Sequence, residues 1–184
     1  MLKPRARLKS VTAITPESLR ERRLKAILLD LDNTLVPYKT YGEAPQGLME
    51  WLQTLKEAGI QIMLVSNGSR GRVRYWSEKL EIPGFGPAGK PWFGFRKALR
   101  RLALSPREVA VVGDQLFTDV LGGNLIGAYT VLVPPLSKRE MGYTRLVRKL
   151  ERWVLQKPGF GLTAGAHEEF DPKECHQKPI MNKD

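Results

Sequence analysis

The chain contains 184 residues, of which 42% are hydrophobic and 27% are charged, and its formal net charge is +11. This length and apolar content fit one domain with a buried sheet core. Cys175 is the only cysteine, which excludes an intrachain disulfide and argues against a cysteine-based zinc site. We expect a cytoplasmic protein, because the sequence shows neither an apolar leader before the first strand nor a run long enough to cross a bilayer.

The first half of the chain predicts helices that alternate with short apolar strands. Thr15-Pro16 combines a capping residue with a first-turn proline, which favours a short helix that ends near Arg23. The unbroken apolar run Ala26–Leu29 is typical of a buried parallel strand. A stripe of leucines predicts a helix over Pro45–Gly59, and a second strand is expected over Ile60–Val65.

The second half continues this alternation. Apolar residues at helical spacing predict further helices, a capping box predicts at most one turn, and two apolar runs predict strands. In chain order these are helices around Val73–Leu80 and Phe95–Leu102, a turn at Ser105–Glu108, a strand over Val109–Val112, a helix over Val120–Ile126 and a strand over Tyr129–Val133. We therefore expect an α/β domain with a parallel sheet and helices on both faces.

Two carboxylates follow the first predicted strand directly. Asp30 and Asp32 are two residues apart, which on extended backbone places both side chains on one side. Ligands of open parallel sheets lie beyond the carboxyl ends of the strands, so this position favours a site. Because adjacent carboxylates repel, the pattern predicts a divalent cation with a preference for oxygen ligands, namely Mg²⁺, and Mg²⁺ commonly accompanies phosphate.

Later segments bring further polar side chains to the same edge of the predicted sheet. Ser66 and Asn67 follow the second strand, and Asp114 and Asp119 follow the strand that ends before them. Lys90 arrives from the segment that links these two exits. Since the carboxyl ends of parallel strands meet at one edge, we expect these groups to converge there.

In this order the residues resemble the four motifs of the haloacid dehalogenase (HAD) superfamily of phosphatases. The motif D-x-D-x-T matches Asp30, Asp32 and Thr34, the strand-end Ser or Thr matches Ser66, the lysine motif matches Lys90, and G-D-x-x-x-x-D matches Gly113, Asp114 and Asp119. The resemblance covers roughly residues 25–135 and implies a three-layer, Rossmann-like HAD fold. The intervals between the motifs leave no room for a large cap domain.

The resemblance also implies how catalysis would be shared among these residues. Asp30 would be the nucleophile that forms an aspartyl-phosphate, and Asp32 would be the general acid and then the general base. Mg²⁺ would be held by Asp30, Asp114 and the main-chain carbonyl of Asp32. No histidine is needed in this scheme.

The remaining residues of the motifs would stabilise charge and hold the substrate. Ser66, Thr34 and the backbone near Asn67 would contact the transferring phosphoryl group, and Lys90 would supply fixed positive charge to it. Asp119 would orient the lysine or a metal-bound water, with Gly113 in support.

Each of these residues also has a purely structural interpretation. An isolated D-x-D can form a turn or a helix cap, and Ser66 can cap the helix that follows it. Lys90 is one lysine of a basic chain, and Asp119 can cap a helix that begins near Val120. The occurrence of all four motifs in order favours the catalytic interpretation.

Within the superfamily, the chain resembles the YqeG-type phosphatases of subfamily IIIA. The resemblance lies in Asp30–Leu35 and Gly113–Val120 and continues through Leu121–Asn124. Mitochondrial phosphatidylglycerophosphate phosphatases share the pattern, which implies hydrolysis of a lipid-borne phosphomonoester to give phosphatidylglycerol. Gly68 departs from the pattern, in which a second asparagine is expected.

The charge distribution bears on the substrate independently. Residues 1–25 carry eight basic and two acidic side chains, a polybasic segment suited to an anionic membrane surface. The stretch Tyr143–Leu155 predicts a basic helix whose apolar stripe fits either the core or a membrane. We expect residues 1–155 to form the phosphatase domain and residues 156–184 to form a flexible tail.

Two other functions fit parts of the sequence. A phosphatase for soluble metabolites needs the same catalytic residues, although a site without a cap encloses a small substrate poorly. A nucleic-acid-binding protein on a degenerate HAD scaffold would explain the high pI. The intact set Asp30, Asp32 and Asp114 argues against the latter, because a binding module does not need it, so we expect no specific nucleic-acid partner.

Overall fold

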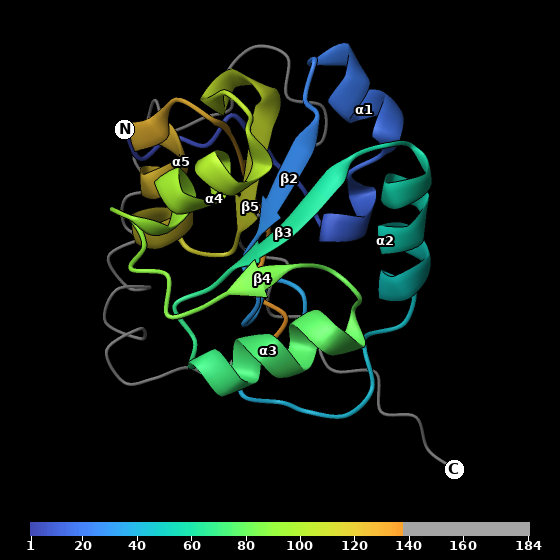
Figure 1. Cartoon of the computed structure of the whole chain (residues 1–184). Coiled ribbons are helices and arrows are strands. Elements are labelled where there is room, and N and C mark those ends of the chain that lie inside the picture. Colours follow the sequence, from blue (N-terminus) through green and yellow to red (C-terminus); the bar gives the residue numbers. More distant parts are fainter. Residues whose placement is uncertain (138–184) are drawn as a thin grey trace.

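The computed structural model describes residues 1–137, which form a single parallel sheet flanked by helices (Figure 1). The six strands are β1 (Ala6–Arg7), β2 (Ala26–Leu29), β3 (Gln61–Val65), β4 (Gly84–Phe85), β5 (Val109–Gly113) and β6 (Tyr129–Leu132). Their order across the sheet is β1-β6-β5-β2-β3-β4, and every pair of neighbours is parallel. The predicted parallel α/β fold is confirmed, and β2 lies at its centre.

Helices cover both faces of this sheet (Figure 1). One face carries α1 (Pro16–Glu21), α2 (Leu48–Glu57) and α3 (Arg70–Lys79), and the other carries α4 (Gly94–Leu102) and α5 (Leu121–Ile126). Short 3-10 turns lie at Val11–Ala13 and Pro106–Glu108. Within residues 1–137, the interval from Thr34 to Ser66 holds only loops, α2 and β3, and the interval from Ser66 to Lys90 holds only loops, α3 and β4, so no cap domain is inserted there.

The central strand shows why a continuous apolar run is required at this position. Ile27 and Leu29 pack with α1, α2 and α3, whereas Ala26 and Leu28 pack with α4. All four side chains are fully buried, because both faces of β2 are covered by helices. Burying an aliphatic side chain of this size contributes about 1.5–3 kcal/mol, so β2 and its neighbours form a rigid base for the site.

Two helix boundaries differ from the sequence prediction. The helix expected from Pro45 begins at Leu48, because Gly47 adopts a left-handed backbone with φ of +76° that interrupts the helix. The helix expected over Val120–Ile126 is preceded by a π-turn over Leu116–Val120, which then continues as α5.

The basic N-terminal segment is part of the sheet. Strand β1 pairs with β6, and Arg7 is only 9% exposed. The side-chain amide of Asn124 donates to the carbonyls of Met1 and Lys3, which ties the first residues to the end of α5. Residues 1–25 are therefore not simply a polybasic arm.

Two further predictions concern residues beyond this part of the chain. The basic helix predicted over Tyr143–Leu155 and the tail predicted over residues 156–184 lie outside the described residues. Among residues 1–137, no helix combines the length and the apolar character that crossing a bilayer requires.

Candidate active site

The carboxyl ends of β2 and β5 bring two carboxylates together. The Asp30 amide donates to the Val112 carbonyl at 3.0 Å, so the pairing of the two strands continues into the site. Thr34 Oγ1 lies 3.3 Å from Asp30 Oδ2 and 3.3 Å from Asp114 Oδ1. Its hydroxyl bridges the two carboxylates, and all three side chains are buried.

A third carboxylate and a lysine complete this buried cluster. Carboxylate oxygens of Asp30, Asp114 and Asp119 lie within 4.8 Å of one another. Lys90 Nζ lies 2.5 Å from Asp30 Oδ1 and 2.7 Å from Asp119 Oδ1. The lysine side chain is 2% exposed, so these ion pairs are shielded from water. The expected convergence of the strand exits is thus present in the structure.

The environment of the cluster changes the protonation of its members. Burial raises the pKa of the Asp30 carboxyl to about 6, although Lys90 opposes this rise and Asp119 adds to it. Burial alone would lower the pKa of Lys90, but Asp119 and Asp30 outweigh it and raise this pKa above its usual value. Lys90 is therefore a permanent cation beside a carboxyl group that titrates near neutral pH.

The charges of the cluster fit a divalent cation. Three carboxylates face one ammonium group, which leaves two negative charges in a buried space. Carboxylate and hydroxyl oxygens are hard ligands of the kind that Mg²⁺ prefers. The carboxylate of Asp32 is not a member of this cluster, whereas Asp119 is. The resemblance to the HAD motifs implies that Asp32 would contribute its main-chain carbonyl, and not its carboxylate, to such a cation.

Gly113 makes the position of Asp119 possible. A β-carbon at Gly113 would lie 2.2 Å from Cγ and from Oδ2 of Asp119, closer than atoms can approach. The Asp119 carboxylate also accepts the Gln115 amide at 3.2 Å, so it stabilises the turn before α5 while it binds Lys90. The structural and the catalytic interpretations of Asp119 are thus compatible.

Replacing Gly113 by alanine is expected to destabilise the protein by about 1–3 kcal/mol, since the new methyl group overlaps Asp119. The displaced carboxylate would also release Lys90, so the activity that the HAD motifs imply should fall with stability. Urea unfolding measures the first effect. Gly71→Ala is the matched control, because no atom lies within 4 Å of a β-carbon there and alanine is a better helix former. Equal stability of the two variants would contradict the prediction.

Asn67 fixes the main chain of the lysine. The Lys90 amide donates to Asn67 Oδ1 at 2.9 Å, and Asn67 Nδ2 donates to the Lys90 carbonyl at 3.3 Å. Lys90 lies in an irregular segment between β4 and α4. This pair of hydrogen bonds therefore replaces the main-chain support that a strand or helix would give. Asn67 was expected to contact substrate through its backbone, and its side chain has this additional structural task.

Oxygen atoms of Ser66 and Asp32 lie close to Gly68. Ser66 Oγ accepts the Gly68 amide at 3.0 Å. A β-carbon at Gly68 would lie 3.2 Å from Ser66 Oγ and 3.3 Å from Asp32 Oδ2. An asparagine there would occupy the space between these two oxygens, so the glycine keeps that space open.

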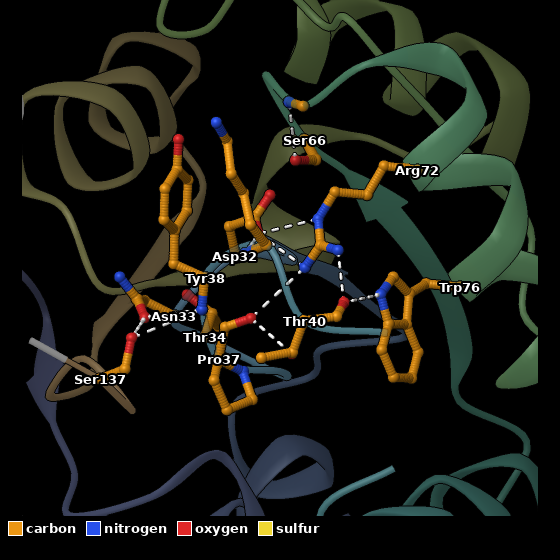
Figure 2. Close-up of polar contacts among 12 residues, drawn as sticks. Asp32, Asn33, Thr34, Pro37, Tyr38, Thr40, Ser66, Arg72, Trp76 and Ser137 are labelled. Atoms are coloured by element: carbon orange, nitrogen blue, oxygen red, sulfur yellow. Dashed lines mark hydrogen bonds and ion pairs between the residues drawn. The ribbon is translucent and has the colours of Figure 1, made fainter. Parts of the chain in front are cut away.

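Asp32 is held by an arginine that the sequence did not single out (Figure 2). Arg72 Nε and Nη2 lie 2.9 Å and 2.8 Å from Asp32 Oδ1, and the arginine side chain is 5% exposed. The same guanidinium donates to the carbonyls of Thr40 and Pro37. Arg72 therefore fixes one oxygen of Asp32, ties down the loop after β2 and leaves Oδ2 beside Ser66.

Two signals in the sequence point to this network in retrospect. Arg72 and Trp76 are four residues apart on α3, so they share a helix face, and both donate to the Thr40 carbonyl (Figure 2). Asn33 adopts a left-handed backbone with φ of +66°, which asparagine tolerates, and its side chain accepts from Ser137 Oγ and the Tyr38 amide.

Comparison with known proteins supports the family membership that the geometry of the site indicates. A profile of haloacid dehalogenase-like hydrolases matches residues 39–127. The chain is 44% identical over 149 residues to "Probable phosphatase YqeG" of Bacillus subtilis, with 80% of this chain and 86% of that protein covered. A solved HAD-superfamily hydrolase from Ehrlichia chaffeensis has a TM-score of 0.50 at 19% identity, covering 70% of this chain and 98% of that one, which supports the fold alone.

Two eukaryotic relatives carry more specific names. The mitochondrial phosphatidylglycerophosphatase GEP4 of Saccharomyces cerevisiae is 33% identical over 143 residues, with 64% of this chain and 75% of that protein covered. The chloroplastic/mitochondrial phosphatidylglycerophosphate phosphatase 1 of Arabidopsis thaliana is 26% identical over 171 residues, with coverages of 84% and 47%. The chain thus spans about half the length of the plant protein. The chain belongs to the haloacid dehalogenase-like hydrolases, among the phosphatases of that family.

Proposed function

We propose that this phosphatase hydrolyses a phosphomonoester through an aspartyl-phosphate on Asp30, and that its substrate is phosphatidylglycerophosphate. The observation that carries the proposed chemistry is the buried cluster of Asp30, Asp114 and Asp119 around Lys90. A dianionic phosphate needs neutralisation and an in-line nucleophile. Lys90, together with a cation held by the carboxylates, would supply the first, and Asp30 would supply the second.

In the proposed first step, an Asp30 oxygen attacks phosphorus while the bond from phosphorus to the leaving oxygen breaks. Asp32 donates its proton to that leaving oxygen, so the alcohol departs neutral. In the second step Asp32 takes a proton from water, the water oxygen attacks phosphorus, and the bond from phosphorus to the Asp30 oxygen breaks, which regenerates the carboxylate and releases inorganic phosphate. The support for this assignment is that Asp32 Oδ2 and Ser66 Oγ both border the same position, lying 3.3 Å and 3.2 Å from where a β-carbon at Gly68 would be.

The other residues would stabilise the negative charge of the phosphoryl group. Lys90 would offer its ammonium group to the phosphoryl oxygens, and Ser66 would donate its hydroxyl. Thr34 bridges Asp30 and Asp114, which supports a positioning role for its hydroxyl beside the substrate contact expected from the sequence. Asp30, Asp114 and the Asp32 carbonyl would hold Mg²⁺, which when bound neutralises and orients phosphate.

Stabilisation by Mg²⁺ is expected to depend on pH. The metal-free pKa of Asp30 is raised to about 6 by burial, so below this pH a proton must leave before the cation binds. The apparent affinity should fall by up to about tenfold per pH unit below pH 6 and level off above it. The rise in melting temperature on adding Mg²⁺, measured from pH 5 to pH 8, tests this. A shift that is constant from pH 5 to pH 8 would refute it.

The raised pKa of Asp30 also determines whether the stability of the metal-free protein rises or falls with pH. Because the folded-state pKa of Asp30 lies above its ordinary value of 3.8, the folded state binds the proton more tightly than the unfolded state. This contribution to stability is complete below about pH 4 and is lost as the pH rises through 6. Added cation should reverse that loss.

The proposal of a lipid substrate is supported by the names of the two eukaryotic relatives and by the absence of a cap between the motifs within residues 1–137. A phosphomonoester on a lipid headgroup can reach an uncapped site from the bilayer surface. The net charge of +11 also favours approach to an anionic surface.

Comparing turnover of phosphatidylglycerophosphate in anionic vesicles with turnover of a panel of soluble phosphomonoesters tests this substrate. We expect Mg²⁺-dependent release of phosphate with a preference for the lipid that weakens as salt rises, because salt screens attraction to the surface. Equal or better turnover of a soluble metabolite would favour the soluble-substrate alternative. Salt-sensitive retention of RNA without any turnover would favour a binding protein.

A further inference from the structure

Exposed apolar side chains gather at the edge of the sheet that carries the site. Tyr41 follows β2, Trp92 and Phe93 follow β4, and Leu136 follows β6. All strands are parallel, so these loops leave the same edge as Asp30 and Asp114. Large exposed apolar residues at one edge of the sheet indicate an interaction surface there.

Two of these residues closely follow the proposed catalytic lysine in the chain. Trp92 is 60% exposed and Phe93 is 72% exposed, and they are two and three residues beyond Lys90. The amides of both aromatic residues donate to the Gly89 carbonyl at 3.1 Å, which makes a tight turn at the start of α4. This turn presents both rings to solvent while it directs Lys90 inward.

The helix that follows adds positive charge to the aromatic turn. Arg96, Lys97, Arg100 and Arg101 are exposed on α4, and no acidic residue occurs between Glu81 and Glu108. Within residues 1–137, no carboxylate is ion-paired with any of these four side chains. Their charges are available to a partner.

A groove connects the two features. It has a volume of about 660 Å³, with the buried Ala88 and Leu99 in its lining and Pro87, Phe93, Arg96, Lys97 and Arg100 as its exposed members. The ring of Phe85 also lines it, and Lys97 Nζ and Arg101 Cζ each lie 4.8 Å from the centre of that ring. The groove thus has apolar walls and a cationic rim.

We infer that Trp92, Phe93 and the cations of α4 form a surface that docks on an anionic lipid bilayer, here called the α4 docking surface. Aromatic rings settle at the interface between headgroups and acyl chains, and lysine and arginine bind lipid phosphates there. The aliphatic Ala88 and Leu99 of the groove favour lipid over RNA, because bases stack on aromatic rings and gain little from aliphatic groups. This inference rests on the proposed function for its lipid substrate, and it places the docking turn beside Lys90.

The test is co-sedimentation of the full chain with vesicles of phosphatidylglycerol and phosphatidylcholine, and with vesicles of phosphatidylcholine alone. We expect binding to the anionic vesicles to fall at least about tenfold in Trp92→Ser/Phe93→Ser and in Arg96→Gln/Arg100→Gln. Met49→Ser and Arg74→Gln are the matched controls, because these exposed residues lie on α2 and α3, over the opposite face of the sheet. Both controls should bind as the unmodified protein does.

Two activity measurements separate this inference from the proposed substrate. Hydrolysis of p-nitrophenyl phosphate in solution should stay within about twofold in the docking variants, whereas hydrolysis of phosphatidylglycerophosphate in vesicles should fall in parallel with binding. Docking variants that bind vesicles normally would overturn the inference and leave the proposed function intact. Failure of the unmodified protein to hydrolyse the lipid would overturn the proposed substrate, while vesicle binding would still decide the docking surface. Loss of single-stranded RNA binding in the same variants, without vesicle binding by the unmodified protein, would also overturn the inference.

Discussion

Replacing Asp30 by asparagine is expected to reduce phosphate release by about a thousandfold or more with every phosphomonoester, because the amide cannot form the acyl-phosphate bond. The fold should survive, since the two side chains have the same shape and Lys90 keeps Asp119 as a partner at 2.7 Å. Steady-state release of inorganic phosphate measures the loss. Rapid acid quenching of the unmodified enzyme should trap a phosphorylated species that hydroxylamine cleaves, and the variant should give none.

The control for this change is Glu43→Gln, which also converts a carboxylate to an amide but at a side chain that is 98% exposed. Its activity should equal that of the unmodified protein. A variant with asparagine at position 30 that retains more than about a tenth of the activity would show that Asp30 is not the nucleophile. A fully folded variant without a trapped intermediate would support the assignment.

The main strands were predictable because each follows a rule that a single sequence can satisfy. Ala26–Leu29 and Val109–Val112 are unbroken apolar runs, and both are central strands buried on both faces. Strands β1 and β4 contain two residues each, too few to carry a period, and their positions depend on pairing with β6 and β3. That pairing is a tertiary property, so the local sequence does not encode it visibly.

The residues of the site likewise include some that the sequence predicts and some that it does not. Asp30, Asp114 and Ser66 were predictable because they leave strands at the edge where parallel sheets bind ligands. Lys90 belongs to no regular element, and only its place in the order of the HAD motifs selected it among 30 basic residues. Arg72 has no such position, because its partner Asp32 is 40 residues away in the chain. Partnerships of this kind appear only once the fold brings the residues together.

Replacing Arg72 by methionine is expected to lower kcat/KM by about a hundredfold for an alkyl phosphate and by less than about tenfold for p-nitrophenyl phosphate. Arg72 fixes Asp32, the proposed proton donor, and a nitrophenolate leaves without a proton whereas an alkoxide does not. kcat/KM is the appropriate measure, since it reports the steps up to the first irreversible transfer. Stability should also fall by several kcal/mol, because the change leaves Asp32 and two carbonyls without their buried partner.

The conservative variant Arg72→Lys separates positioning from support of the fold. Lysine keeps the positive charge and can reach either Asp32 or the Thr40 carbonyl, but it cannot hold both in the planar arrangement that the guanidinium gives. Arg72→Lys should recover most of the stability. Its kcat/KM should still fall more for the alkyl phosphate than for p-nitrophenyl phosphate. Arg74→Gln, two residues along the same helix and 79% exposed, should change neither quantity. Equal losses with both leaving groups would mean that Arg72 supports only the fold, because a general loss of structure impairs transfer from every substrate alike.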